Sequence, residues 1–236
     1  MVLQGLLAGL GTCLGALIVI TCNRLRPGTF SLLMGFASGV MAAVIIFDLL
    51  PSSLRYGTTL AAFTGLVGGA GILATLDLGI KILSPGTVTG NGYLRVGCLI
   101  AIGIALHDFP EGLAIAAGFA AAGKLGLLLA LAIGIHNIPE GMAVSAPLRA
   151  GGLSITRVLA ISLLISLVTP AGVFAGLILM ENHHVPIGAL MAFAAGAMTY
   201  IVLGALAPVS YRNNGRLACL GAVAGILLIL ALDFIV

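Results

Sequence analysis

Seven short breaks divide this chain into eight long apolar stretches, and that pattern limits the fold more than any other feature. Each stretch has at least the roughly 20 residues that a helix needs to cross the hydrocarbon core of a bilayer. The sequence therefore predicts an all-α fold, a polytopic membrane protein with eight transmembrane helices. We expect spans at residues 2–22, 29–51, 58–83, 93–122, 125–147, 153–180, 186–210 and 216–236.

Composition argues against a soluble domain beside these helices. Hydrophobic residues make up 61% of the chain and charged residues only 7%, whereas about a quarter of the residues in soluble domains are charged. Residues 1–236 are therefore predicted to form a single transmembrane domain. We interpret the 34 glycines as positions where apolar helices pack closely.

The basic residues predict how the chain is oriented. Eight of the ten Lys and Arg residues lie in or beside the breaks after spans 1, 3, 5 and 7, and such a bias marks the cytoplasmic side. Only Arg55 and Lys124 fall on the other side. Both termini are therefore expected outside the cytoplasm. No basic stripe with interleaved aromatic residues indicates a nucleic-acid partner, and membrane lipid is the expected environment.

A polar hexapeptide occurs twice, near the middle of spans 4 and 5. Residues 107–112 read HDFPEG and residues 136–141 read HNIPEG. In each copy the histidine precedes the glutamate by four residues, a spacing that puts both side chains on one face of a helix. The two spans are joined by a short turn and run antiparallel, so the two polar sets are expected to meet at a similar depth in the membrane.

Three carboxylates, Asp108, Glu111 and Glu140, fall in this central region. A carboxylate at the bilayer centre costs at least ~2.5–3.5 kcal/mol on insertion scales, and no Lys or Arg lies near the middle of any span. Protonation or a bound cation must compensate, and the adjacent histidines favour a metal ion. Imidazole and carboxylate ligands suit Zn²⁺ first and Fe²⁺ second, with Mn²⁺, Co²⁺ and Cd²⁺ also acceptable.

Proline and glycine in each hexapeptide add backbone features to the predicted site. Pro110 and Pro139 have no N–H, so each frees a backbone carbonyl one turn earlier in its helix, beside the histidine. Gly112 and Gly141 would let another helix approach the backbone closely.

On these residues the chain resembles the ZIP family of divalent-metal transporters, in its bacterial branch. The doubled H-[ND]-x-P-E-G motif in adjacent helices carries the resemblance, and weaker likeness extends to residues 35–41, 49–51 and 191–198. It implies a transporter rather than an enzyme, with no prosthetic group, that moves divalent metal ions into the cytoplasm by alternating access. It also implies a location in the inner membrane of a prokaryote. The sequence does not decide whether the protein forms a homodimer.

The resemblance also implies an internal arrangement. Residues 1–92 would form helices 1–3, residues 93–147 the two metal-site helices and residues 153–236 helices 6–8. This 3+2+3 order would contain an inverted pseudo-two-fold repeat, which places a substrate near the midplane of the membrane and permits alternating access.

Carried over residue by residue, the resemblance assigns one metal to His107, Glu111, His136 and Glu140. Asp108 and Asn137 would hold a second metal together with the shared glutamates. Thr169 and Ala205 stand where the family commonly has glutamate, so we expect the second metal site to be weak or absent.

Polar residues outside the hexapeptides receive separate interpretations. The resemblance places Met41 and Asp48, seven residues apart on one face of span 2, along the path by which metal reaches the site. A gap-filling core residue is the favoured interpretation of Met41, and a solvated acid at the membrane interface is an equal alternative for Asp48. Asp77 is expected to form an i,i+4 ion pair with Lys81. His183 and His184 could capture metal before it enters, although solvated loop histidines are the favoured interpretation.

Two other functions remain open from the sequence. Histidine and glutamate around Zn²⁺ can also activate water, so an intramembrane metal-dependent hydrolase is one alternative. A ZIP relative that binds metal but transports it poorly is the other, because of Thr169 and Ala205.

Overall fold

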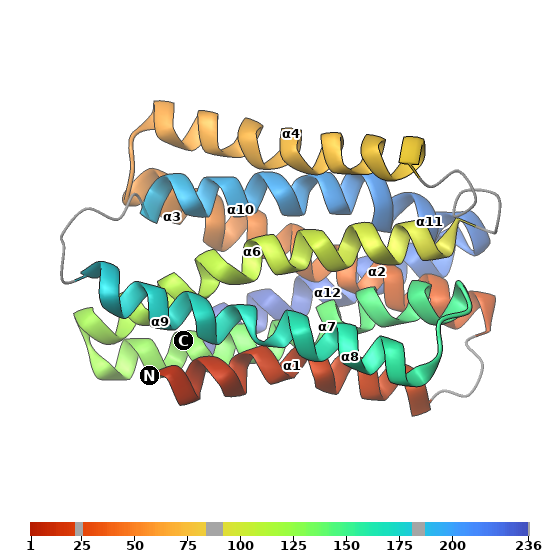
Figure 1. The fold of residues 1–236 in the computed structure, drawn as a ribbon, viewed down its shortest axis with the longest axis horizontal. Helices are drawn as coiled ribbons and strands as arrows, with labels where there is room; N and C mark the ends of the chain where they lie inside the picture. Colours follow the sequence, from red (N-terminus) through yellow and green to blue (C-terminus); the bar gives the residue numbers. More distant parts are fainter. Residues whose placement is uncertain (22–25, 84–91, 181–186, 236) are drawn as a thin grey trace.

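A computed structural model of the chain describes residues 1–21, 26–83, 92–180 and 187–235. Within these ranges the chain is helical apart from short turns, and eight helical spans are long and apolar enough to cross a membrane (Figure 1). The prediction of an all-α protein with eight spanning helices is confirmed. Five spans are unbroken helices: α1 (Val2–Thr21), α4 (Thr59–Leu83), α6 (Tyr93–Ala121), α7 (Gly123–Ala150) and α12 (Gly215–Ile235).

The other three spans are built from shorter pieces. Span 2 consists of α2 (Pro27–Ala43), the π-helical segment η1 (Val44–Leu49) and α3 (Leu50–Arg55). Span 6 is divided into α8 (Ile155–Ser166) and α9 (Val168–Met180). Span 7 consists of α10 (Ile187–Ile201), the π-helical segment η2 (Val202–Leu206) and α11 (Ala207–Asn213).

Three helix ends lie beyond the sequence-based expectation: span 7 continues to Asn213 rather than residue 210, and the other two ends lie after a proline. Span 2 continues beyond Pro51 to Arg55, and α7 continues through Pro147 to Ala150. Proline is tolerated within membrane helices when neighbouring groups or a local π-turn satisfy the freed carbonyl, and the π-helical segment η1 lies directly before the helix that contains Pro51. The turn after α7 instead occurs at Gly152, whose positive φ of 92° suits a residue without Cβ.

The helices pack as four close pairs around the centre of the bundle. α1 lies along α7, α6 along α9, α2 along α12 and α4 along α10, while α6 and α7 also contact each other (Figure 1). Glycine brings the backbones together in each pair. A methyl group on Gly141, Gly112, Gly39 or Gly69 would overlap a carbonyl oxygen of the partner helix, which confirms the interpretation of glycine as a packing residue.

Spans 2 and 7 share a local structural pattern that was not predicted from the sequence. In both, an α-helix passes into a π-helical segment and then into a short α-helix with proline at its second residue, Pro51 or Pro208. The residue pairs Phe36 and Phe193, Met41 and Met198, and Pro51 and Pro208 are all separated by the same length of chain. Spans 2 and 7 therefore share both their residue spacing and their sequence of helix types.

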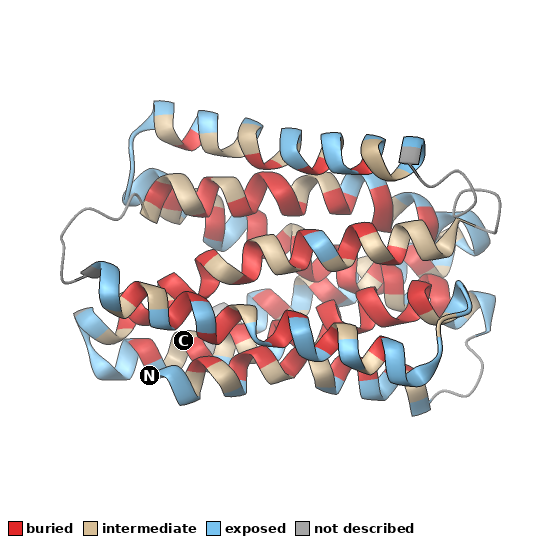
Figure 2. Ribbon diagram, viewed as in Figure 1, coloured by how far each residue is buried: buried red, intermediate tan, exposed pale blue. Residues whose placement is uncertain are grey.

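The outer surface of the bundle is apolar. Large hydrophobic side chains such as Leu60, Phe63 and Leu203 are exposed, and the outer side of α4 is exposed along most of its length (Figure 2). An apolar surface of this extent would be a liability in water and matches a lipid environment. Both termini lie at the same end of the bundle, as an even number of spans requires (Figure 1).

Adjacent glycines on α4 provide a test of close packing. The alanine methyl of Gly69→Ala would overlap the Phe193 carbonyl oxygen of α10, whereas nothing lies within 4 Å of the equivalent position in Gly68→Ala. We expect Gly69→Ala to lose about 1–3 kcal/mol of stability, the usual cost of overpacking, and to unfold at a lower temperature in detergent. Gly68→Ala is the matched control and should unfold at the wild-type temperature or above it.

Candidate metal centre

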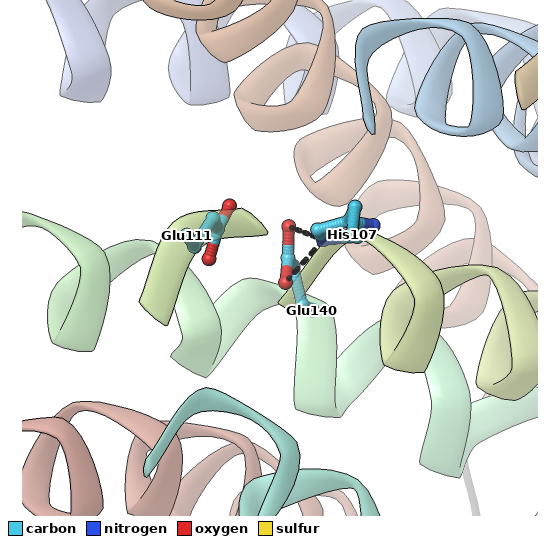
Figure 3. Close-up of side chains that lie close together, drawn as sticks. All are labelled: His107, Glu111 and Glu140. Atoms are coloured by element: carbon cyan, nitrogen blue, oxygen red, sulfur yellow. Dashed lines mark hydrogen bonds and ion pairs between the residues drawn. The ribbon is translucent and has the colours of Figure 1, made fainter. Parts of the chain in front are cut away.

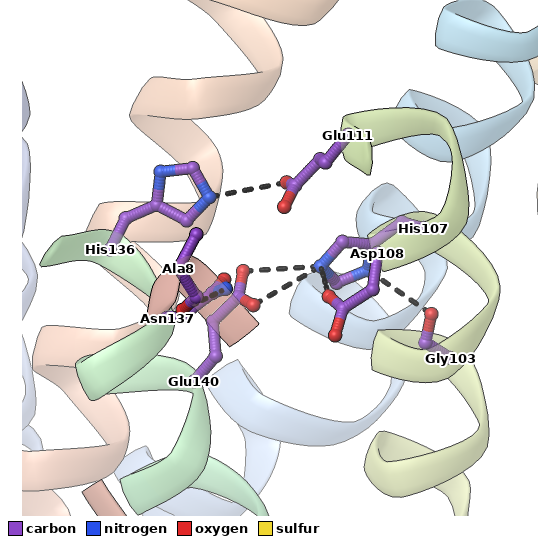
Figure 4. Close-up of polar contacts among 8 residues, drawn as sticks. All are labelled: Ala8, Gly103, His107, Asp108, Glu111, His136, Asn137 and Glu140. Carbon is purple, nitrogen blue, oxygen red and sulfur yellow. Dashed lines mark hydrogen bonds and ion pairs between the residues drawn. The ribbon is translucent and has the colours of Figure 1, made fainter. Parts of the chain in front are cut away.

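The centre of the bundle holds two histidine–glutamate pairs that cross between α6 and α7. His107 Nε2 of α6 lies 3.2 Å from both carboxylate oxygens of Glu140 on α7. In return, His136 Nε2 of α7 lies 3.2 Å from Glu111 Oε1 of α6 (Figure 4). Each histidine thus faces the glutamate of the other helix. These contacts form because the two helices are antiparallel and carry their hexapeptides at a similar depth. All four side chains are buried.

The backbone of α6 fixes the orientation of the His107 ring. His107 Nδ1 lies 3.1 Å from the Gly103 carbonyl oxygen, which can only accept a hydrogen bond, so Nδ1 carries the proton (Figure 4). In the neutral tautomer, Nε2 then presents its lone pair toward Glu140. A lone pair that faces a carboxylate needs a positive species between them, and a backbone carbonyl behind the imidazole is a usual support for metal-binding histidine.

Three of these residues can reach one point. Ligand atoms of His107, Glu111 and Glu140 all lie within 4.8 Å of one another, and all three residues are buried (Figure 3). Zn²⁺ binds nitrogen and oxygen ligands at about 2.0–2.2 Å, so the three ligand atoms would draw slightly closer around a shared ion. His136 adds a second imidazole through its contact with Glu111.

Asp108 and Asn137 extend the polar region. Asp108 is fully buried, and its nearest ionic partner is His107 Nε2 at 3.5 Å, a contact that does not qualify as a hydrogen bond. Asn137 Nδ2 donates to the Ala8 carbonyl of α1 at 3.1 Å (Figure 4). Among the described residues, both Asp108 oxygens, Asn137 Oδ1 and Glu111 Oε2 are buried without a hydrogen-bond partner. The buried carboxylate oxygens among these need a proton or a cation to compensate them.

The flanking helices approach this region through the glycines of the two hexapeptides. Gly112 lies against the Thr169 carbonyl oxygen of α9, and Gly141 lies against the Thr12 carbonyl oxygen of α1. The close approach expected for both glycines is therefore present. Thr12 and Thr169 are buried, and neither hydroxyl has a hydrogen-bond partner among the described residues. Each motif helix is thus covered in the same way by one neighbour.

Sequence comparisons connect this geometry to known proteins. The statistical model of the ZIP zinc transporter family matches residues 83–233, more than half of the chain. The chain belongs to the ZIP family. It is 32% identical to the zinc transporter ZupT of Corynebacterium glutamicum, over 93% of this chain and 92% of that protein. It is also 32% identical to the zinc transporter GufA of Myxococcus xanthus (97% and 95%) and to the zinc transporter ZIPB of Bordetella bronchiseptica (98% and 80%).

Membership of the ZIP family decides between classes of function. This ZIP chain is an integral membrane transporter and not an enzyme, so the alternative of an intramembrane hydrolase is wrong. The expected resemblance to the bacterial branch is confirmed by the ZupT and GufA relatives. Residues His183 and His184, expected in a loop, lie outside the residues that the structure describes.

Met41 and Asp48 occupy different environments in this ZIP chain. Met41 is fully buried in the core, whereas Asp48 is exposed on η1, close enough to His136 for its charge to act on the imidazole. Residues 44–49 are π-helical, so the α-helical spacing assumed between the two side chains is not kept. The expectation of one shared face therefore needs correction, and a place on the metal path remains a prediction for both residues.

Asp77 has more partners than the sequence predicted. The expected ion pair is present, with Lys81 Nζ 2.9 Å from Asp77 Oδ2. In addition, Arg95 Nε of α6 donates to Asp77 Oδ1 at 2.9 Å, and the Tyr200 hydroxyl of α10 donates to Asp77 Oδ2 at 3.0 Å. The apolar periodicity of these helices gave no signal for either contact.

Zinc should stabilise the folded ZIP protein, because a ligand that binds only the native state raises its stability. Saturation at a hundred times the dissociation constant adds about 2.7 kcal/mol, so we expect a higher unfolding temperature in detergent when Zn²⁺ is present. Glu140→Gln, which removes the charge opposite His107, should lose most of this shift. Cys98→Ala is the control and should keep it; an equal shift in Glu140→Gln would place the bound zinc elsewhere.

Proposed function

We propose that this ZIP protein carries divalent transition-metal ions, Zn²⁺ first, across the membrane and into the cytoplasm. The metal would bind near the midplane between α6 and α7, with His107, Glu111, His136 and Glu140 as its ligands. One observation carries the proposal: the histidine of each helix lies 3.2 Å from a carboxylate oxygen of the glutamate on the other helix. Each helix supplies one histidine and one glutamate, so the full set of four ligands forms only where α6 and α7 face each other.

The donor set supports a transition metal as the substrate. Imidazole nitrogen together with carboxylate oxygen suits Zn²⁺ and, after it, Fe²⁺, Mn²⁺, Co²⁺ and Cd²⁺, whereas Mg²⁺ and Ca²⁺ prefer shells made only of oxygen. The relatives named above are described as zinc transporters. Because metal binding requires neutral imidazole and ionised carboxylate, affinity for the ion should fall as the pH falls.

Alternating access would move two bodies of helices against each other. We assign α1, α6, α7, α8 and α9 to one body and α2, η1, α3, α4, α10, η2, α11 and α12 to the other. Among the described glycines, every approach to the backbone of another helix lies within one of these bodies. Between the bodies, Gly103 of α6 meets only side chains, those of Ile201 in α10 and Leu73 in α4. Backbone contacts would thus hold each body together, while side chains form the interface.

The equivalence of spans 2 and 7 supports an inverted repeat. The close pairs fall into two equivalent sets, α1 with α7 beside α9 with α6, and α2 with α12 beside α10 with α4. In a 3+2+3 arrangement these pairs are exchanged by a pseudo-two-fold axis in the membrane plane, which is the usual architecture for alternating access. The excess of basic residues at one end of the bundle supports a cytoplasmic location for that end.

A second metal at Asp108 and Asn137 remains a weaker prediction. Thr169 contributes a hydroxyl where the family commonly has a carboxylate, and Ala205 is a buried apolar residue on η2. The orphaned oxygens of Asp108 and Asn137 still favour a cation. We therefore propose one principal metal and a secondary position of lower affinity.

Zinc flux through purified protein tests the proposed function. Reconstituted into liposomes that contain a zinc-sensitive dye, the wild-type protein should admit Zn²⁺ at a rate that saturates with concentration. His107→Ala and Glu140→Ala each remove a ligand and should reduce the initial rate by at least about 100-fold, the equivalent of roughly 2.7 kcal/mol in binding.

Two further results separate the alternatives for this ZIP chain. Cys98→Ala, on the same helix as His107 but outside the site, should transport at the wild-type rate. Zinc binding by wild-type protein without any flux would identify a transport-impaired relative. Saturable flux that survives in both His107→Ala and Glu140→Ala would remove the proposed site.

A further inference from the structure

A groove lies between α1 and α7 on the outer surface of the bundle. The cavity has a volume of about 200 Å³. Its rims are exposed apolar side chains from the two helices, Leu7 and Leu14 on α1 and Leu127, Leu131 and Ile135 on α7. Because the protein spans a membrane and these side chains are on its surface, the groove opens toward the hydrocarbon of the bilayer.

Small residues form the floor of this groove. A methyl group on Gly11 of α1 would overlap the carbonyl oxygen of Gly134 of α7, so the two backbones approach each other closely there. Ala8 and Ala130 also line the groove, and both are buried. Close approach requires small side chains at these positions. Such side chains do not fill the space between the larger residues of the rims, and this leaves the groove.

An unsatisfied polar atom lies at one end of the groove. α1 and α7 run in the same direction, because Gly11 lies against Gly134 and Gly15, further along α1, lies against Ile138. Gln4, near the start of α1, lines the groove, and its Oε1 atom is buried without a hydrogen-bond partner among the described residues. A buried amide oxygen without a donor is costly. The start of the groove therefore offers a hydrogen-bond acceptor to a molecule that enters it.

A positive charge lies at the same end. Lys124 precedes Leu127 and Leu131 by three and seven residues, so it lies on the groove face of α7, one turn beyond the rim. Its side chain is exposed. From Lys124 to Ile135 the helix rises roughly 16 Å at 1.5 Å per residue, about half of the ~30 Å hydrocarbon core of a bilayer. The groove and its polar end therefore match the depth of one leaflet.

These features correspond to the parts of a phospholipid molecule. An acyl chain fits the apolar groove, a phosphate group can pair with the ammonium of Lys124, and a hydroxyl of the head group can donate to Gln4 Oε1. Basic residues at the membrane surface attract anionic lipids. Phosphatidylglycerol carries both a net negative charge and hydroxyl donors. Phosphatidylcholine has neither, so the polar end of the groove favours the first lipid over the second.

We propose that the groove between α1 and α7 binds one anionic glycerophospholipid with hydroxyl groups in its head group. The acyl chain lies between the two rims, and the head group lies between Gln4 and Lys124. The bound lipid holds α1 against α7 directly behind the second hexapeptide, where the Ala8 carbonyl accepts a hydrogen bond from Asn137 Nδ2 at 3.1 Å. This lipid site is separate from the metal centre and does not depend on the proposed transport function.

Fluorescence quenching tests the site, because the chain contains no tryptophan of its own. Leu131→Trp introduces one tryptophan on the rim of the groove, and Val67→Trp introduces one on α4, away from it. Leu131 is 56% exposed and Val67 is 54% exposed. Both follow the first residue of their helix by the same number of residues, and both helices start at the same end of the bundle. The two tryptophans therefore report on lipid at a similar depth.

The full-length proteins are reconstituted in phosphatidylcholine liposomes with increasing fractions of phosphatidylglycerol that is brominated in its acyl chains. Leu131→Trp should be half quenched at a fraction about tenfold lower than Val67→Trp, because the groove concentrates this lipid; tenfold corresponds to about 1.4 kcal/mol. Brominated phosphatidylcholine should quench both proteins at similar fractions.

Three further substitutions in the Leu131→Trp protein make the result specific. Lys124→Gln should raise the fraction needed for half quenching about fivefold, the equivalent of about 1 kcal/mol for a basic residue beside anionic lipid. Gln4→Leu removes the orphaned oxygen, so it should also raise this fraction and leave the folded protein intact. Arg55→Gln is the matched control, because Arg55 is exposed on α3, outside the groove; it should leave the fraction unchanged.

Several results would overturn the proposal: equal quenching of Leu131→Trp and Val67→Trp by phosphatidylglycerol, no change in Lys124→Gln or in Gln4→Leu, or an equal change in Arg55→Gln. Fluorescence of Leu131→Trp that neither lipid quenches would show that a second protein chain covers the groove, and would also overturn it. Protein without tryptophan provides a second measurement. Phosphatidylglycerol added in detergent should raise its unfolding temperature, and Lys124→Gln should lose most of this rise; an equal rise in Lys124→Gln would again contradict the site.

Discussion

The architecture depends on how three carboxylates are neutralised in the middle of a membrane. Asp108, Glu111 and Glu140 have no lysine or arginine near them at that depth, and a charge left unpaired there would be too costly to bury. The two histidines provide partial compensation through contacts that cross between α6 and α7. In the proposed function, a divalent ion completes it. The carboxylates that make α6 and α7 costly to insert into a membrane would then make the two helices depend on each other and on the metal.

Glycine determines how the remaining helices surround this centre. In a bilayer, apolar side chains gain little by leaving lipid for protein, so helices associate through close packing rather than through the hydrophobic effect. Gly112 and Gly141 let α9 and α1 reach the backbone beside each hexapeptide, and equivalent glycines join α4 to α10 and α2 to α12. The candidate metal centre is consequently flanked by the backbones of α1 and α9.

The sequence was sufficient to predict the eight spans and the residues that meet at the centre. Long apolar stretches and a doubled motif are strong signals because membrane crossing and helical spacing leave few alternatives. The π-helical segments and the continuation of α7 through Pro147 could not be predicted, because they depend on which neighbours satisfy the freed carbonyls. The Arg95 and Tyr200 partners of Asp77 were missed for a related reason. Contacts between helices depend on rotation and register, and an almost uniformly apolar helix has no polar face from which to read them.

Backbone contacts lie within each set of helices and side-chain contacts lie between the sets, and this difference also predicts the order in which parts of the protein unfold. Each set of glycine-joined helices is held by contacts that cannot loosen without separating whole backbones, whereas the seam between the sets is closed by side chains such as Ile201. Regions with unequal local stability open as separate cooperative units. Under a pulling force or in a harsh detergent, the two sets of helices would therefore separate from each other before either set unfolded. The helices α6 and α7, which carry the two hexapeptides, would remain together in one of the sets.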